Sequence, residues 1–523
     1  MTLQRRITWY LKRARVMSAG EVAQRLKNQL TLVSLAAEHG RLARPEGIAL
    51  AFCHGTARQL PDLPFNMDEI RRSKDRLIAG HFPALGFDWK WHDQPDIWRR
   101  APDSGRLWPA RFFGSIPYRS GNAVGDVRVV WEPARLQQLV ALALLAREPQ
   151  VGAQALDMLE RQLLSWAFCN APWGGVHFVS AMECALRVIS VCHSVDMVRD
   201  RLVRPGQVFD AVSHVVSSHA GFIVRRLSVH SSAGNHTIAE CAGLIYAGIL
   251  FPEWPEAKGW QRAGTDLLVA EFQRQVMDDG GGVEQAFWYL LFISDLVALV
   301  VALLRHHNVT VPSELLDRLD RAQNFLREFA HAPDSLPHIG DRDGGFALSS
   351  ALRLSVNRRD RVKATKIFRD SGYSVARTPS DETMEVIFDH GPMGMPPSYG
   401  HAHADALAVT VRRRGNDVLV DSGTGTYNGD PDWRRYFRST AAHNTVEIDG
   451  RDQAVQETAF QWTSPVRAEL VRVDVSREGY RGLAVHYGYQ TASLGIKHWR
   501  GVRLTARGQM IVWVMCPPPL CGQ

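Results

Sequence analysis

The stretch Leu407-Ala-Val-Thr-Val-Arg-Arg-Arg-Gly-Asn-Asp-Val-Leu-Val-Asp421 has the pattern of two short β-strands joined by a tight turn. Short runs rich in β-branched residues lie on either side of Arg414-Gly-Asn416, whose residues are typical of turns. Similar runs occur at Met384–Asp389, Thr445–Asp449, Val466–Val475, Tyr480–Tyr487, Trp499–Leu504 and Met510–Met515. Strands that follow one another without intervening helices predict antiparallel sheets, and we expect a β-sandwich over residues 366–523.

The part of the chain that precedes these strands has helical spacing. From about Trp131 to Leu352, apolar residues recur every three or four positions, and short connections with Pro or Gly separate the segments. Long helices with short links pack as antiparallel hairpins. The predicted fold class is therefore multidomain α + β. A partly helical N-terminal extension (1–110) comes first, a helical domain (111–355) follows, and the sandwich comes last.

Composition narrows the class of protein. With 523 residues, of which 45% are hydrophobic and 22% charged, the chain is globular and long enough for two domains. The formal net charge of +7 suits an acidic partner such as an anionic polysaccharide, a nucleic acid or a membrane surface. No basic block or arginine-rich arm is present, so we expect no nucleic-acid partner. Seven scattered cysteines without a CxxC pair argue against a disulfide framework or a cysteine zinc site.

Neither the N-terminus nor any internal segment predicts membrane insertion. The first thirty residues are basic and mixed, without the apolar core of a signal peptide. Ala286–Leu304 approaches the length of a membrane span, but Asp295 in its middle costs roughly 2.5–3.5 kcal/mol on insertion. We expect a buried helix there and no transmembrane segment. The sequence indicates no oligomeric state.

The densest polar motif is Tyr399-Gly-His-Ala-His-Ala-Asp405. On a strand, His401 and His403 would point to one face and converge, either as two metal ligands or as one ligand beside an acid/base group. Asp421 and His443 follow in the sequence, and two histidines with one carboxylate suit zinc. The alternative is a hydrogen-bonded sheet face that has no metal.

Two further motifs lie in the helical half. Asn235 and His236 follow Ser231-Ser-Ala-Gly at the start of a predicted helix. Asn235 is either a helix cap or, together with His236, a polar pair presented to a cleft. The turn Asp278–Gln285 leads into a helix that carries Tyr289, a residue type that is usually part of the core.

Taken in order, these segments resemble the heparinase II/III family, within the alginate-lyase-like polysaccharide lyases. The resemblance covers about residues 120–515. Its helical motifs are Val127–Glu132, Trp173–Arg187, Asn235-His236, Asp279-Gly-Gly281, Glu284-Gln285 and Tyr289. Its later motifs are Leu336–Asp341, Asp370–Tyr373, Gly400–Leu407, Val420–Thr424 and Arg438–Thr445.

The resemblance implies an incomplete (α/α) toroid that faces an antiparallel β-sandwich across a cleft. It also implies β-elimination on a uronic-acid-containing polysaccharide of glycosaminoglycan, alginate or exopolysaccharide type. It places the protein in the cell envelope or periplasm, although the absence of a visible signal peptide leaves the cytoplasm open.

Roles for single residues also follow from the resemblance. Asn235 and His236 match the pair that neutralises the substrate carboxylate, Tyr289 matches the acid/base tyrosine, and His401 matches its partner histidine. The motifs imply substrate binding by Glu183, Arg187, Glu284 and Arg438. They imply a divalent metal, with zinc as the expected ion, held by His403, Asp421 and His443.

The sequence departs from the family pattern at two places. His177 and Phe178 stand where the family usually has Asn and Trp, which affects substrate subsites. The segment Cys516–Gln523 contains three successive prolines that cannot extend a sheet, so we expect a shortened sandwich.

Two other functions compete with the lyase. One is a catalytically idle polysaccharide-binding protein, against which the presence of Asn235, His236, Tyr289 and His401 argues. The other is a hydrolase that activates water at the metal.

Overall fold

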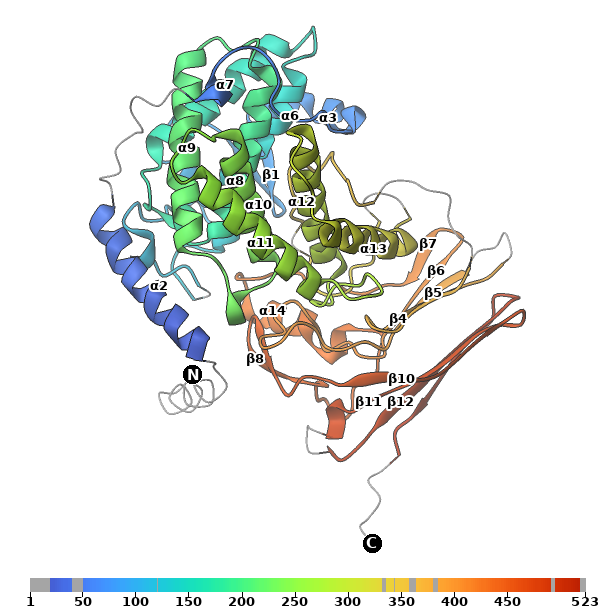
Figure 1. The fold of residues 1–523 in the computed structure, drawn as a ribbon. Coiled ribbons are helices and arrows are strands. Elements are labelled where there is room, and N and C mark those ends of the chain that lie inside the picture. Colours follow the sequence, from blue (N-terminus) through green and yellow to red (C-terminus); the bar gives the residue numbers. More distant parts are fainter. Residues whose placement is uncertain are drawn as a thin grey trace.

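The computed structural model describes residues 19–39, 50–119, 121–331, 335–342, 344–356, 364–379, 384–490 and 494–517. A helical part comes first in the chain and antiparallel sheets come last, and the two parts lie against each other (Figure 1). This arrangement confirms the predicted α + β class. The predicted boundary at 353–365 lies largely in residues outside the described ranges.

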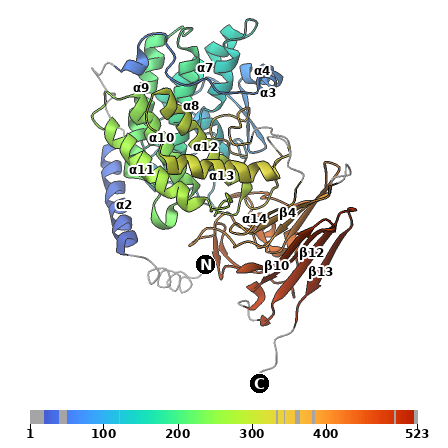
Figure 2. The same ribbon diagram turned by 45° about the vertical axis from the view of Figure 1, so that its right-hand side comes forward.

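Eight helices of the described helical part form two rows. The inner row is α6 (Gln138–Leu145), α8 (Ala181–Val198), α10 (Asn235–Leu250) and α12 (Phe287–His306). The outer row is α7 (Gly152–Cys169), α9 (Pro205–Arg225), α11 (Ala257–Gln275) and α13 (Ser313–Phe329). Each inner helix packs against its inner neighbours and against outer helices (Figure 2). Every residue of α8 is buried, whereas the outer helices bury one face. This is the arrangement of an incomplete (α/α) toroid.

Helix α12 is long and apolar enough to cross a membrane by length and composition, but 89% of its apolar window is buried within the fold. Its one carboxylate, Asp295, accepts hydrogen bonds from the backbone N–H groups of Leu354 and Ser355 at 3.1 and 2.7 Å. Burial raises the pKa of Asp295 to about 6. The prediction of a buried core helix around Asp295 is confirmed.

The described residues of the predicted N-terminal extension include helices and pack on the toroid. It contains α2 (Ala19–Glu38), α3 (Met67–Arg72), α4 (Lys74–Ile78) and a hairpin of β1 (His81–Ala84) and β2 (Phe87–Lys90). Helix α5 (Val127–Ala134) then leads into the toroid and is wholly buried. The hairpin was not predicted: each strand has four residues, the shortest run over which alternation indicates a strand.

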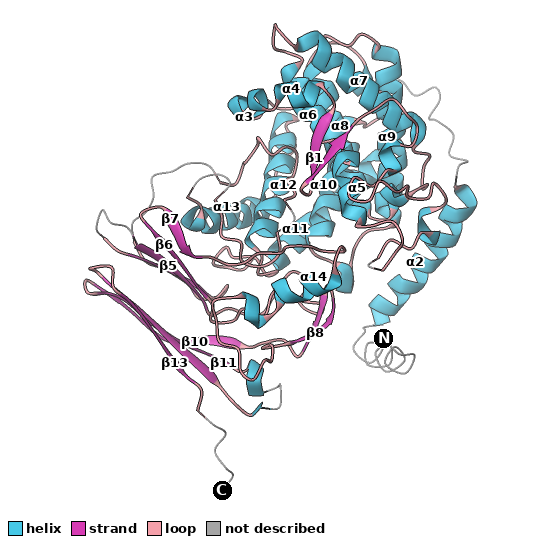
Figure 3. Ribbon diagram, turned by 180° about the vertical axis from the view of Figure 1, so that it is seen from behind, coloured by secondary structure: helices cyan, strands magenta, loops and turns pink. Residues whose placement is uncertain are grey.

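Two antiparallel sheets form the sandwich (Figure 3). One sheet contains β3 (Lys366–Phe368), β4 (Tyr373–Arg377), β5 (Met384–Asp389), β6 (Val409–Arg413) and β7 (Asn416–Leu419) in that order. The other contains β10 (Ala468–Ser476), β11 (Gly479–His486), β12 (His498–Thr505) and β13 (Met510–Met515). Val386, Phe388 and Val409 pack against Tyr480 and Val502 between the sheets. Residues 518–523 lie outside the described ranges, so the shortened sandwich stays a prediction.

Two loops of the β part correct predictions. His401 and His403 lie in the loop between β5 and β6 and not on a strand, and Thr445–Asp449 forms a loop in the segment between β7 and β10. The latter is held by side chains: the Thr445 hydroxyl donates to the Ala406 carbonyl at 2.7 Å, and the Arg500 guanidinium donates to the Asn444 carbonyl. The same segment contains α14 (Pro431–Arg438), β8 (Val455–Thr458) and β9 (Gln461–Thr463).

Buried histidines make the helical part sensitive to acid. Burial lowers the pKa values of His177 and His193 to about 3. Below a pH of about 6.5 these two histidines are protonated in the unfolded chain but stay neutral in the folded chain. The free energy of unfolding therefore decreases as the pH is lowered. We expect each group to cost ~2 kcal/mol of unfolding free energy at pH 5 relative to pH 7.

Urea unfolding of the parent and of His177→Asn at both pH values checks this expectation. The variant should lose less stability between pH 7 and pH 5 than the parent does. An identical pH dependence in the two proteins would contradict the assignment.

Candidate active site

A cavity of about 970 Å³ lies between the helical part and the loops of the β part. Its helical wall includes Arg128, Arg135, Glu183, Asn235, His236 and Tyr289. Its other wall includes Ser398, His401, Tyr427 and Phe460. The volume is within the usual range for ligand sites, roughly 300–1,000 Å³. Asn235, His236, Tyr289 and His401, which the sequence singled out from both halves, are therefore brought together.

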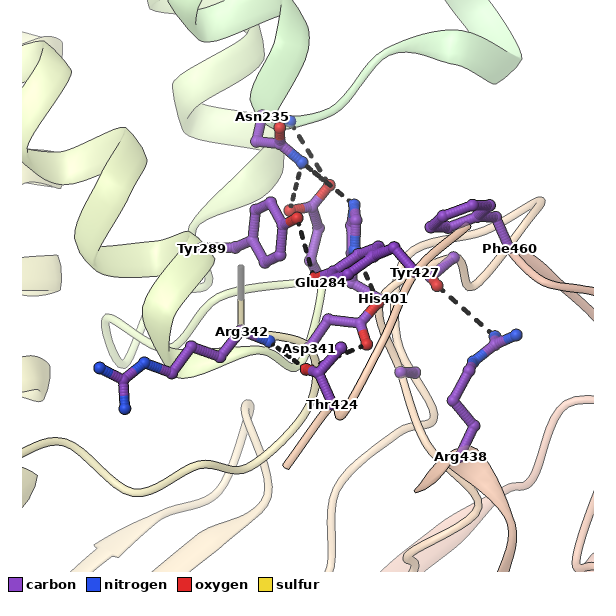
Figure 4. A network of polar contacts seen from close by, with 12 residues as sticks. Asn235, Glu284, Tyr289, Asp341, Arg342, His401, Thr424, Tyr427, Arg438 and Phe460 are labelled. Carbon is purple, nitrogen blue, oxygen red and sulfur yellow. Dashed lines mark hydrogen bonds and ion pairs between the residues drawn. The ribbon is translucent and has the colours of Figure 1, made fainter. Parts of the chain in front are cut away.

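Asn235 is the first residue of α10, and Gly234 occupies the capping position. The Asn235 amide nitrogen lies 3.2 Å from both carboxylate oxygens of Glu284 and 3.3 Å from Nε2 of His401 (Figure 4). The amide is therefore directed across the cavity and does not cap its own helix. The helix-cap alternative for Asn235 is wrong.

Tyr289 and His401 form the centre of the site. Their rings stack with centroids 3.9 Å apart at an interplanar angle of 26°. The Tyr289 hydroxyl lies 3.1 Å from the hydroxyl of Tyr427, which comes from the β part. A phenol and an imidazole in contact at the wall of a cavity can pass a proton to and from a bound ligand.

Asp341 fixes the orientation of two histidines at once. One carboxylate oxygen lies 3.1 Å from Nδ1 of His401, and the other lies 3.0 Å from Nε2 of His403. Arg434 donates to both oxygens at 2.6 and 2.7 Å. Burial alone would raise the pKa of Asp341, but Arg434 and the two histidines hold it well below its usual range. With Nδ1–H of His401 donated to this carboxylate, Nε2 is left as the acceptor that faces Asn235.

His236 follows Asn235 and is only partly buried, with its side chain in the cavity wall. Burial and the nearby His401 lower the pKa of His236 to about 4, so its ring is neutral at pH 7. A neutral imidazole can donate one hydrogen bond to a ligand carboxylate.

His403, Asp421 and His443 form a possible metal centre. Their ligand atoms all lie within 4.8 Å of one another, and Nδ1 of His443 is 3.0 Å from a carboxylate oxygen of Asp421. Nδ1 of His403 and Nε2 of His443 are buried and have no hydrogen-bond partner in the described part of the chain. Two orphaned imidazole nitrogens beside a carboxylate fit a zinc ion. The carboxylate that holds Nε2 of His403 is the outer partner such a ligand normally has.

The structure places the four predicted substrate-binding residues differently. Glu284 and Glu183 line the cavity, although Glu183 is fully buried and pairs with Arg135 at 2.8 Å. Arg187 is fully buried, donates to the Ala134 carbonyl and lies 2.7 Å from Nε2 of His219.

Arg438 is also fully buried and donates to the carbonyls of Thr458 and Ala459. Neither Arg187 nor Arg438 lines the cavity. The prediction that these two arginines bind substrate is wrong, because hydrogen bonds within the fold occupy their guanidinium groups.

Sequence reasoning missed three residues of the site. Asp341 ends one quoted motif, but nothing in the sequence shows that its carboxylate lies between two histidines sixty residues further on. Tyr427 lies in a loop that has no regular periodicity, and Arg434 lies in the short helix α14 that follows this loop. The sequence did contain a signal for the helix that carries Arg434: Asp430 is a typical N-cap residue, and a short helix follows it.

Comparison with known proteins identifies the family. The profile of the heparinase II/III N-terminus matches residues 202–353, and that of the heparinase II/III-like C-terminal domain matches residues 360–514. The chain belongs to the heparinase II/III family. The two matched ranges together cover more than half of its length. They contain Asn235, Tyr289, Asp341 and His401.

Curated relatives and solved structures agree with this family. A heparin-sulfate lyase of Bacteroides stercoris is 26% identical over 269 residues, 46% of this chain and 39% of that protein. A heparin-sulfate lyase of Bacteroides thetaiotaomicron is 25% identical over 295 residues, 49% and 42% respectively. The matched regions thus span about two-fifths of these relatives.

Two solved structures share the fold. A heparinase III crystal structure has a TM-score of 0.61 at 16% identity and covers 93% of this chain and 75% of that chain. A heparan sulfate lyase of Pedobacter heparinus has a TM-score of 0.51 at 16% identity, over 94% and 74%.

Proposed function

We propose that this heparinase II/III family protein is a polysaccharide lyase that cleaves a uronic-acid-containing polysaccharide by β-elimination. The observation that carries the proposal is the meeting of Asn235, Tyr289 and His401 at one point of a shared cavity. Five arginines line that cavity, against two glutamates that already accept hydrogen bonds. An excess of positive charge favours an acidic ligand. We also propose a location in the cell envelope, which rests on the family resemblance alone.

The residues supply each requirement of the elimination. The proton on C5 of the uronate becomes acidic only when the charge of the adjacent carboxylate is offset, and Asn235 and His236 donate hydrogen bonds for this purpose. The base removes that proton, the C5–H electron pair forms the C4=C5 double bond, and the C4–O4 bond breaks. O4 leaves with the bonding electrons and takes up a proton. Tyr289 and His401, in contact, handle both proton transfers.

The metal centre is structural in this proposal. His403, Asp421 and His443 would hold zinc, which would fix the loops that carry them. None of the three lines the cavity. A hydrolase would need an ion open to substrate, so this placement favours the lyase over the metal-dependent hydrolase.

Loss of one ligand tests the metal. We expect His443→Ala to retain less than a tenth of the zinc that the parent binds, because two remaining ligands hold the ion poorly. Elemental analysis after dialysis measures this, with His236→Ala as the matched histidine control that keeps its metal. Equal zinc content in the parent and in His443→Ala would show that His443 is not a zinc ligand and would contradict the proposed metal site.

Asn235→Ala tests charge neutralisation. Removal of a donor that acts on charge developed in the transition state typically costs 10²–10³-fold in turnover, and we expect a loss of this size. The thermal midpoint should change little, because the amide does not cap α10. Steady-state kinetics and thermal melting of the same preparation measure both quantities. Normal turnover with a lowered melting temperature would show a structural role only.

The proposal as a whole is tested by a screen. The protein is incubated with heparan sulfate, alginate and other uronate polysaccharides, and ultraviolet absorbance reports the unsaturated product. Absorbance should rise with at least one of them. No rise with any uronate polymer, from a folded and metal-loaded protein, would refute lyase activity.

A further inference from the structure

Arg226 directly follows α9 and lines the helical wall of the cavity. Its side chain is half-buried and makes no hydrogen bond or ion pair with any residue that the structure describes. The ring of Phe113 lies 5.9 Å from its guanidinium carbon. Burial lowers the pKa of Arg226. A desolvated cation without a counter-charge is unfavourable unless a ligand supplies one.

Glu240 is the acidic side chain whose charge affects the pKa of Arg226, but it forms no ion pair with Arg226. Glu240 is fully buried, and its two carboxyl oxygens accept hydrogen bonds from the backbone N–H and the hydroxyl of Ser228 at 2.6 and 2.7 Å. Burial raises the pKa of Glu240 to about 8, so it is largely protonated at pH 7. Arg226 therefore faces the cavity without an ion-pair partner in the described part of the chain.

Other arginines of the cavity wall differ from Arg226. Arg135 pairs with Glu132 and Glu183, Arg25 pairs with Glu21, and Arg128 stacks on the ring of Tyr427 at 3.9 Å. Arg119 resembles Arg226: it is exposed, lines the cavity, and its side chain has no partner among the described residues.

We propose that Arg226, assisted by Arg119, is a second anion-binding position, which binds a sulfate or carboxylate group on the sugar next to the cleaved uronate. This inference rests on the proposed lyase function, in which Asn235 and His236 already bind the carboxylate of the cleaved uronate. A guanidinium binds either oxyanion through two parallel hydrogen bonds. The consequence is a preference for polymers in which both sugars of the repeat are acidic.

Binding of defined tetrasaccharides separates the possible ligands. The first ligand alternates uronate with a neutral hexosamine, the second carries sulfate on that hexosamine, and the third consists of uronate alone. Calorimetry in the Tyr289→Phe background prevents turnover. Arg226→Gln is compared with Arg225→Gln, a matched control because Arg225 pairs with Glu38 and lies outside the cavity lining.

We expect Arg226→Gln to lower the affinity for the sulfated or the all-uronate ligand by about 10- to 100-fold. Binding of the first ligand should change less than threefold, and Arg225→Gln should bind all three as the parent does. Loss confined to the second ligand assigns sulfate, and loss confined to the third assigns carboxylate. Arg119→Gln, at an exposed site that tolerates substitution, should show the same selectivity more weakly.

Equal affinity of Arg226→Gln and the parent for all ligands would overturn the inference. So would an equal loss for all three, or a parent that binds none of them. Cleavage of the same sugars by the protein with Tyr289 intact is measured separately. If none of these sugars is cleaved, the polymer screen described above decides on the lyase, and the binding measurement alone decides on the role of Arg226.

Discussion

Replacement of Tyr289 by Phe should abolish most of the turnover and leave the fold intact. The substitution removes only a hydroxyl and keeps the ring that stacks on His401 at 3.9 Å. General acid–base groups contribute roughly 10²–10⁴-fold, so we expect the turnover number to fall at least a hundredfold. Initial rates of product absorbance measure the effect.

The matched control is Tyr427→Phe, because the two hydroxyls lie 3.1 Å apart and only that of Tyr289 is assigned the proton. We expect Tyr427→Phe to lose much less activity than Tyr289→Phe. Nearly full activity of Tyr289→Phe would show that the central residue of the mechanism is wrong, whatever the fold.

Asp341→Asn should have the second-largest effect, on both stability and turnover. The carboxylate is fully buried and contacts His401, His403 and both terminal nitrogens of Arg434. Loss of its charge leaves Arg434 buried without a counter-ion, which typically costs about 3–5 kcal/mol. An amide can also donate a hydrogen bond to Nδ1 and stabilise the wrong tautomer of His401, so turnover should fall roughly 10²–10⁴-fold.

A second substitution separates the two effects. Asp341→Asn combined with Arg434→Gln restores the balance of buried charge, so much of the unfolding free energy should return. Turnover should stay low, because His401 is still held in the wrong form. If turnover recovers together with stability, Asp341 acts only as a structural counter-ion.

The sequence predicted those parts of the fold that depend on local periodicity. Strands β5 and β13 have the predicted bounds, and the buried helix around Asp295 is present, because apolar spacing directly reflects which face is buried. The loop that carries His401 and His403 was predicted as a strand. Its alternation of His and Ala has the period of a strand, but long-range bonds to Asp341 fix its conformation.

In the candidate site, too, the sequence predicted what local motifs determine and missed what long-range contacts determine. Asn235, Tyr289 and His401 were identified because their segments, taken in order, resemble the heparinase II/III family, although each residue alone also suited a structural role. Arg187 and Arg438 also lie in motifs, but their charges are used within the fold. Asp341 and Arg226 could not be given roles from sequence, since their importance depends on neighbours far along the chain or on the lack of a counter-charge.

Mass spectrometry of the cleavage products tests the central claim most directly. The protein is incubated with a uronate oligosaccharide of known mass, and both fragments are weighed. β-Elimination predicts fragments whose masses add up to that of the substrate, with the C4=C5 double bond on one of them. Fragments that together weigh one water more than the substrate would show hydrolysis and contradict the account.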